Sequence, residues 1–89
     1  MAYRPKDTQE RILHRLKIAR GHLGKVIHMV ESQQYCIDVL HQSKAVQRAL
    51  KEADNLILEN HLKTCAADAV KKGKKTEAIE EVMSVFKRT

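Results

Sequence analysis

Hydrophobic residues recur at helical spacing over most of the chain, and no segment alternates at the period of two expected for a β-strand. A capping-box pattern at Asp7 and Glu10 predicts that the first helix begins near Thr8. Spacings of four and three residues then repeat along this helix, which is the a/d pattern of helices that pack lengthwise. The residues of this seam are Ile12, Leu16, Ala19, Leu23, Val26 and Val30.

The second predicted helix is the longest. It begins at about Tyr35 or Ile37, after a polar turn at residues 31–34, and continues to Val70. Residues 56–70 contain neither glycine nor proline, so no helix breaker interrupts its second half. Two rows of residues keep helical spacing along it, and the first row places His61 where a core residue would be expected. The rows are Val39, Val46, Leu50, Ala53, Ile57 and His61, and Leu58, Leu62, Cys65 and Ala69.

A basic loop at residues 71–75, with Gly73 inside it, should end the second helix. A short third helix should begin at Thr76, with Ile79, Val82, Met83 and Phe86 on its apolar face. Helices 1 and 2 form a hairpin whose wide apolar face one protomer cannot cover. We therefore predict an all-α fold with three helices per protomer, in which two hairpins form an antiparallel four-helix-bundle dimer.

The chain has 89 residues, which indicates a single domain (residues 1–89) with a flexible N-terminal tail at residues 1–7. No apolar run reaches the length of a membrane span, so a membrane partner is not expected. Two cysteines are too few for a disulfide scaffold, which favours a cytoplasmic protein with free thiols. No arrangement of base and nucleophile is evident, so an enzyme is the weakest interpretation.

The chain is basic: 17 Lys and Arg against 11 Asp and Glu give a net charge of +6. On a helical wheel, Arg11, Arg15 and His22 lie within about 40° of one another, and His14 and Lys25 flank them. A second stripe on helix 2 comprises Lys44, Arg48 and Lys51. Such stripes are often only solvated faces, but two of them favour contact with the phosphates of double-stranded DNA. Aromatic residues are too few for the stacking that single-stranded nucleic acids require.

Three residues could bind a metal ion. His61 and Cys65 are four residues apart, so one helix face can bring an imidazole and a thiolate to the same ion. Cys36 lies 25 residues before His61, which is about 37 Å along a continuous helix. Either Cys36 is irrelevant, or it reaches the pair on an antiparallel neighbour, with the site between two subunits. Two thiolates and an imidazole favour Cu(I), with Zn(II) as a competitor.

Three stretches of the chain resemble the CsoR family, the copper-sensitive operon repressors of bacteria. They are residues 15–24 (RLKIARGHLG), Tyr35 with Cys36, and residues 59–65 (ENHLKTC). The resemblance implies an all-α dimer that pairs into a tetramer. It also implies a repressor that binds operator DNA when metal-free and is released by Cu(I). Related nickel and cobalt sensors typically have His at the position of Cys65, and formaldehyde and persulfide sensors lack the complete Cys-His-Cys set.

The resemblance also implies that Tyr35 and Glu81 belong to a hydrogen-bond network around His61. A nitrogen of His61 that does not bind metal carries a hydrogen, for which a carboxylate is a suitable acceptor. From the residues alone, Tyr35 is better explained as a boundary aromatic at the start of the second helix and Glu81 as a solvated charge on the third. Family members can carry Arg at the position of Glu52, so this acidic residue departs from the family pattern.

The sequence is also compatible with two other functions. One alternative is a sensor of the same fold that responds to nickel, zinc or a reactive sulfur species, with Cys36 and Cys65 acting as thiols. A second alternative is a cytosolic copper buffer that does not bind DNA. A copper donor is a further partner to be expected for either copper-binding function.

Overall fold

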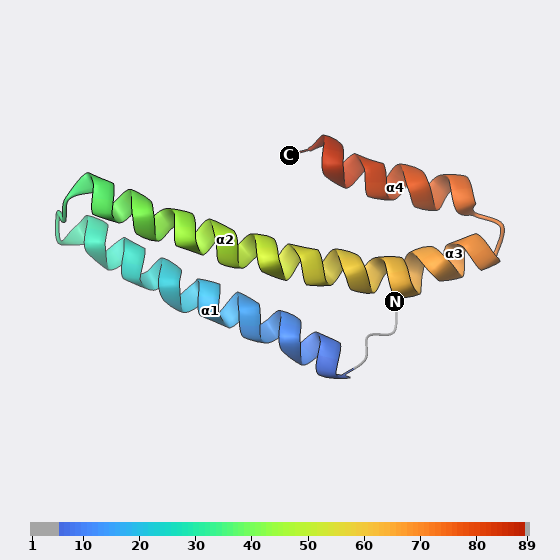
Figure 1. Cartoon of the computed structure of the whole chain (residues 1–89), viewed down its shortest axis with the longest axis horizontal. Helices are drawn as coiled ribbons and strands as arrows, with labels where there is room; N and C mark the ends of the chain where they lie inside the picture. Colours follow the sequence, from blue (N-terminus) through green and yellow to red (C-terminus); the bar gives the residue numbers. More distant parts are fainter. Residues whose placement is uncertain (1–5, 89) are drawn as a thin grey trace. The chain divides into compact units, whose positions relative to one another are not determined.

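The computed structural model describes residues 6–88, and within this range it contains helices and turns but no strand (Figure 1). This confirms the all-α prediction. The chain divides into two compact units: one comprises the described residues up to Ile57, and the other begins at Leu58. The elements are α1 (Lys6–Glu31), α2 (Cys36–His61), the π-helical segment η1 (Leu62–Ala66), α3 (Ala67–Lys71) and α4 (Lys75–Lys87).

Helix α1 begins at Lys6, two residues before the predicted start at Thr8. Residues 6 and 7, which the sequence assigned to the tail, belong to this helix, and residues 1–5 lie outside the described residues. Asp7 lies in the first turn of α1, where its negative charge interacts favourably with the positive end of the helix dipole.

In the first unit, α1 and the α2 residues up to Ile57 run antiparallel and side by side (Figure 1). Alternate residues of the predicted seam on α1, namely Ile12, Ala19 and Val26, are buried together with Met29, Val46 and Ala53. The remaining seam residues, Leu16, Leu23 and Val30, are 37%, 48% and 59% exposed. The hairpin thus uses one half of the seam and leaves a second apolar row uncovered.

The turn between α1 and α2 closes with two backbone hydrogen bonds of the Schellman type. Gln34 N–H donates to the carbonyl of Met29 at 3.0 Å, and Gln33 N–H donates to that of Val30 at 3.0 Å. Gln33 has a φ of 56°, the left-handed conformation that this motif requires and that glycine usually supplies. At this φ the backbone of Gln33 is strained, because glutamine, unlike glycine, carries a Cβ atom.

Replacing Gln33 with glycine should therefore raise the free energy of unfolding by about 1 kcal/mol, because the left-handed conformation costs an L-residue more than glycine. Urea denaturation at a fixed protein concentration measures this change. The control is Gln34→Gly, because Gln34 does not have a positive φ. That variant should lower the stability, and an equal effect of both substitutions would contradict the explanation.

The prediction of one regular helix to Val70 is wrong at residues 62–66, where the π-helical segment η1 separates α2 from α3. The Thr64 hydroxyl donates a hydrogen bond of 2.7 Å to the carbonyl of Asn60, four residues earlier. Such a hydroxyl competes with the backbone N–H groups for this carbonyl and disturbs the regular helix. No glycine or proline signals the change, and π-helical segments occur frequently at functional sites.

In the second unit, α4 packs against α3 and η1, with Ala78 buried. The turn before α4 is a second Schellman motif, in which Gly73 has the expected positive φ of 80°. Val82, from the predicted apolar face of α4, is half-buried, whereas Ile79, Met83 and Phe86 are exposed. Among residues 6–88, no helix combines the length and hydropathy needed to cross a membrane.

Candidate metal centre and basic surface

A pocket of about 240 Å³ lies within the second unit, between the end of α2, η1, α3 and α4. Its lining includes both His61 and Cys65, so the interruption of the α-helix still leaves these two side chains on one side of the chain. The other lining residues are Ala66, Ala69, Lys74, Glu77, Ala78 and Glu81. An imidazole and a thiol in one pocket form a donor pair for a soft metal ion.

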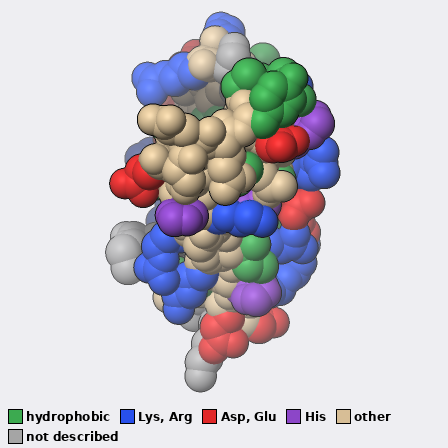
Figure 2. Space-filling view, turned by 90° about the vertical axis from the view of Figure 1, so that its left-hand side faces the viewer, with side chains coloured by type: hydrophobic (Ala, Val, Ile, Leu, Met, Phe, Trp, Pro, Cys, Tyr) green, Lys and Arg blue, Asp and Glu red, His purple; other side chains and the backbone are tan. Residues whose placement is uncertain are grey.

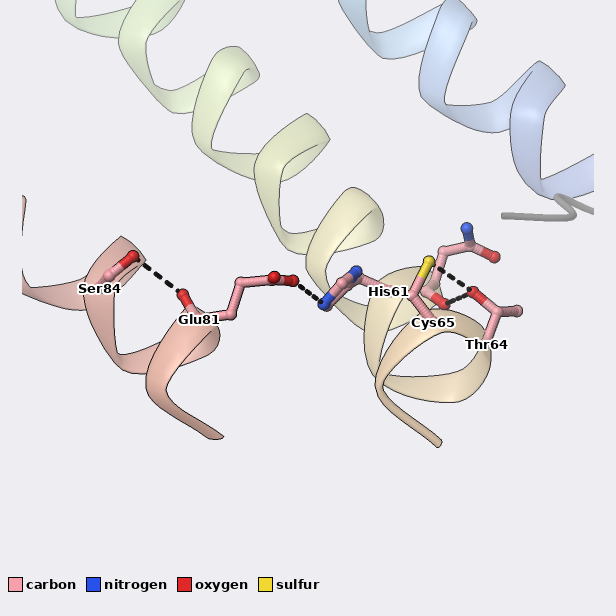
Figure 3. Close-up of polar contacts among 6 residues, drawn as sticks. His61, Thr64, Cys65, Glu81 and Ser84 are labelled. Atoms are coloured by element: carbon pink, nitrogen blue, oxygen red, sulfur yellow. Dashed lines mark hydrogen bonds and ion pairs between the residues drawn. The ribbon is translucent and has the colours of Figure 1, made fainter. Parts of the chain in front are cut away.

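Glu81 is the residue of α4 that approaches this pair. Its Oε1 lies 3.3 Å from His61 Nε2, an ion-pair distance. Figure 3 marks this contact with a dashed line. The His61 side chain is 28% exposed, whereas that of Glu81 is 70% exposed. A carboxylate at this position can fix the orientation of the ring and select which nitrogen carries the hydrogen.

Thr64 is a neighbour of the thiol that the sequence did not single out. Its Oγ1 lies 3.7 Å from Cys65 Sγ, and the same oxygen bonds to the Asn60 carbonyl (Figure 3). Since a hydroxyl has one hydrogen, it can donate to the carbonyl or to the sulfur, but not to both at full strength. The signal that could have found it is a β-branched hydroxyl residue directly before the cysteine.

The structure places Cys36 and Tyr35 in the other unit. Cys36 is the first residue of α2 and is exposed, with its thiol unbonded to another cysteine. Tyr35 directly precedes the helix and is 67% exposed. Within residues 6–88 of a single chain, no three His, Cys, Asp or Glu side chains form a group that could hold a metal ion. One chain therefore assembles the pair His61 and Cys65, but not the predicted set of three.

The predicted DNA-contacting residues lie on the hairpin. Arg11, Lys44, Arg48 and Lys51 are exposed. Figure 2 shows the end of the molecule at the turn between α1 and α2, where Lys, Arg and His side chains lie on both flanks with acidic side chains among them. Basic side chains on both helices can contact phosphates without any base-specific bond.

Two contacts between α1 and α2 were not predicted. Arg15 forms an ion pair with Glu52 through Nη1 and Oε2. His22 Nε2 lies 2.6 Å from Gln42 Oε1, in a part-buried hydrogen bond. Neither contact can be found from helical spacing alone, because both depend on how the two helices are aligned.

An all-α chain with basic helices and an imidazole–thiol pair has the composition expected of a metal-responsive regulator. Comparison with known proteins gives the family. The model of a family described as metal-sensitive transcriptional repressor matches residues 8–88. The chain therefore belongs to the metal-sensitive transcriptional repressor family, as the resemblance in its sequence implied, and this confirms a regulator rather than an enzyme.

Individual relatives are similar over nearly the whole chain. The copper-sensing transcriptional repressor CsoR of Mycobacterium ulcerans is 44% identical over 89 residues, which are 100% of this chain and 76% of that protein. CsoR of Bacillus subtilis is 38% identical over 86 residues, which are 97% of this chain and 85% of that protein. The crystal structure of CsoR with Cu(I) from Geobacillus thermodenitrificans has a TM-score of 0.89 and 39% identity, covering 99% of this chain and 92% of that one.

Proposed function

We propose that this chain is a cytoplasmic Cu(I)-responsive repressor that binds operator DNA when metal-free and leaves it when Cu(I) binds. The observation that carries this proposal is the pocket in which His61 and Cys65 lie together. Their imidazole and thiolate suit a soft ion, and relatives at 38–44% identity are named as copper-sensing repressors. When bound, Cu(I) supplies a soft acceptor that draws thiolate and imidazole donors to one point.

The third donor in this proposal is Cys36 of a second protomer, and residues 1–89 act as one metal-sensing, DNA-binding domain in the assembly. Cys36 and His61 are the first and last residues of α2, so about 37 Å of helix separates them within one chain. An antiparallel partner removes this separation. The uncovered row of Leu16, Leu23 and Val30 supplies apolar surface for such a partner, and two dimers can pair further into a tetramer.

In the dimer, the partner's Cys36 would complete the set with His61 and Cys65, and Tyr35 would come to the same region. Glu81 then links the set to α4, because its carboxylate already lies beside the ring of His61. A change in the orientation of His61 would shift α4 and α2 together. The basic residues of the hairpin, which are Arg11, Arg15, Lys44, Arg48 and Lys51, would no longer match the spacing of the phosphates on the operator.

Replacing Glu81 with glutamine should therefore weaken the release of DNA by Cu(I), while the metal-free protein still binds DNA normally. Partners of a metal-bound histidine typically contribute about 10–100-fold, and we expect the factor by which Cu(I) lowers DNA affinity to fall by this order. Anisotropy titrations of a labelled operator with and without Cu(I) measure this factor. Glu80→Gln is the matched control, because Glu80 is exposed and does not line the pocket. A normal factor in Glu81→Gln would remove Glu81 from the mechanism.

The function itself is tested with a duplex that the metal-free protein selects from a random library. Under anaerobic conditions, one equivalent of Cu(I) per chain should release this duplex, whereas Ni(II), Zn(II) and a persulfide donor should not. Release of the duplex by Ni(II), Zn(II) or the persulfide donor, but not by Cu(I), would indicate a different sensor of the same fold. Absence of any salt-dependent DNA binding would indicate a copper buffer instead.

A further inference from the structure

The ion pair between Arg15 and Glu52 bears directly on the basic surface. It joins α1 to α2 across the hairpin, and the two side chains are 42% and 48% exposed. Arg15 is one of the five predicted DNA-contacting residues, and it also opens the stretch at residues 15–24 that resembles the family. In this chain its guanidinium is held by a carboxylate rather than left open to a phosphate.

A second contact, between His22 and Gln42, also joins the two helices of the hairpin. The bond between His22 and Gln42 lies seven residues further along α1 and ten residues earlier on α2 than the ion pair. Glu52 also lies one helical turn after Arg48 on α2. An acidic side chain is therefore placed among basic residues of both helices, on the surface that DNA would contact.

We propose that Glu52 masks Arg15 and thereby limits the affinity of the metal-free protein for DNA, an inference that rests on the proposed function. A phosphate that binds Arg15 must compete with Glu52, and the carboxylate also repels the phosphate. Exposed ion pairs contribute little to stability, so the pair can open when DNA binds. Because DNA and Cu(I) oppose each other through linkage, weaker DNA binding also lets a lower Cu(I) concentration release the protein.

The test is a double-mutant cycle with Glu52→Gln, Arg15→Ala and the double variant, measured by anisotropy on the selected duplex. Asp54→Asn is the charge-matched control, because Asp54 is an exposed acid on the same helix. Glu52→Gln should tighten binding at least about fivefold, whereas Asp54→Asn should tighten it less than about twofold. In the Arg15→Ala background, Glu52→Gln should have no more effect than the control. In Glu52→Gln, the slope of log affinity for DNA against log salt concentration should steepen by about 0.9 for each Arg15 that gains a phosphate contact.

Equal effects of Glu52→Gln and Asp54→Asn would overturn the proposal, since only net charge would then matter. Weaker DNA binding by Glu52→Gln would also overturn it, because Glu52 would then be orienting Arg15 for the phosphate. The salt concentration at which each variant elutes from heparin, a polyanion, tests the masking of Arg15 independently of the proposed function. If the wild type binds no duplex, the proposed function fails, but later elution of Glu52→Gln than of Asp54→Asn, dependent on Arg15, would still support masking by Glu52.

Discussion

Replacing Cys36 with alanine should abolish the release of operator DNA by Cu(I), although Cys36 and His61 lie at opposite ends of α2. The substitution removes one of three proposed donors. We expect the Cu(I) affinity to fall by more than about 100-fold, because even the loss of an outer partner of a metal ligand costs about 10–100-fold. Competition with a chromogenic Cu(I) chelator measures this change, and anisotropy on the selected duplex measures the release.

Gln34→Ala is the control for this experiment. Gln34 is exposed, lies in the turn before Cys36 and is not one of the proposed Cu(I) donors. The control should keep both the affinity and the release of the wild type. The metal-free Cys36→Ala protein should bind the duplex normally, since Cys36 is not part of the basic surface. If Cu(I) releases Cys36→Ala as readily as the wild type, Cys36 is not a ligand.

Replacing Leu23 with glutamate should dissociate the proposed dimer and, as a consequence, remove the proposed three-donor Cu(I) site. Leu23 is 48% exposed in one chain and lies in the middle of the uncovered row on α1. The folded hairpin should tolerate the change, whereas a charge buried between protomers without a partner is strongly destabilising. Sedimentation velocity should show monomers, and the Cu(I) affinity should fall to that of Cys36→Ala.

His28→Glu introduces the same charge on the same helix at an exposed position outside the seam. This control should remain a dimer and bind Cu(I) normally. A Leu23→Glu protein that sediments as a dimer would place the interface elsewhere. A monomer with full Cu(I) affinity would contradict the shared site, because a single chain would then supply all the donors.

The helical periodicity was sufficient to predict the fold of the hairpin. Ile12, Ala19 and Val26 are buried as the seam requires, because an amphipathic helix must cover its apolar stripe. The seam alone did not show which of its residues the neighbouring helix covers, and Leu16 and Leu23 remain 37% and 48% exposed in one chain. That division depends on the alignment of α1 with α2.

The candidate site was predictable only where its residues are close in sequence. His61 and Cys65 line one pocket, as their spacing indicated, although η1 replaces the expected α-helix. The Thr64 hydroxyl bond that accompanies η1 is a local competition that helical patterns do not reveal. The contact of Glu81 with His61 needed the family resemblance, and the pairing of Arg15 with Glu52 needed the structure.

The shared site is tested most directly by mixing two inactive variants. Cys36→Ala and Cys65→Ala protomers, each with a different affinity tag, are co-expressed, and the mixed dimer is isolated by two successive purifications. In the mixed dimer, the intact Cys36 of one protomer can meet the intact His61 and Cys65 of the other. We predict one high-affinity Cu(I) per mixed dimer and none in either variant alone. A mixed dimer without high-affinity Cu(I) would contradict a site built between two subunits.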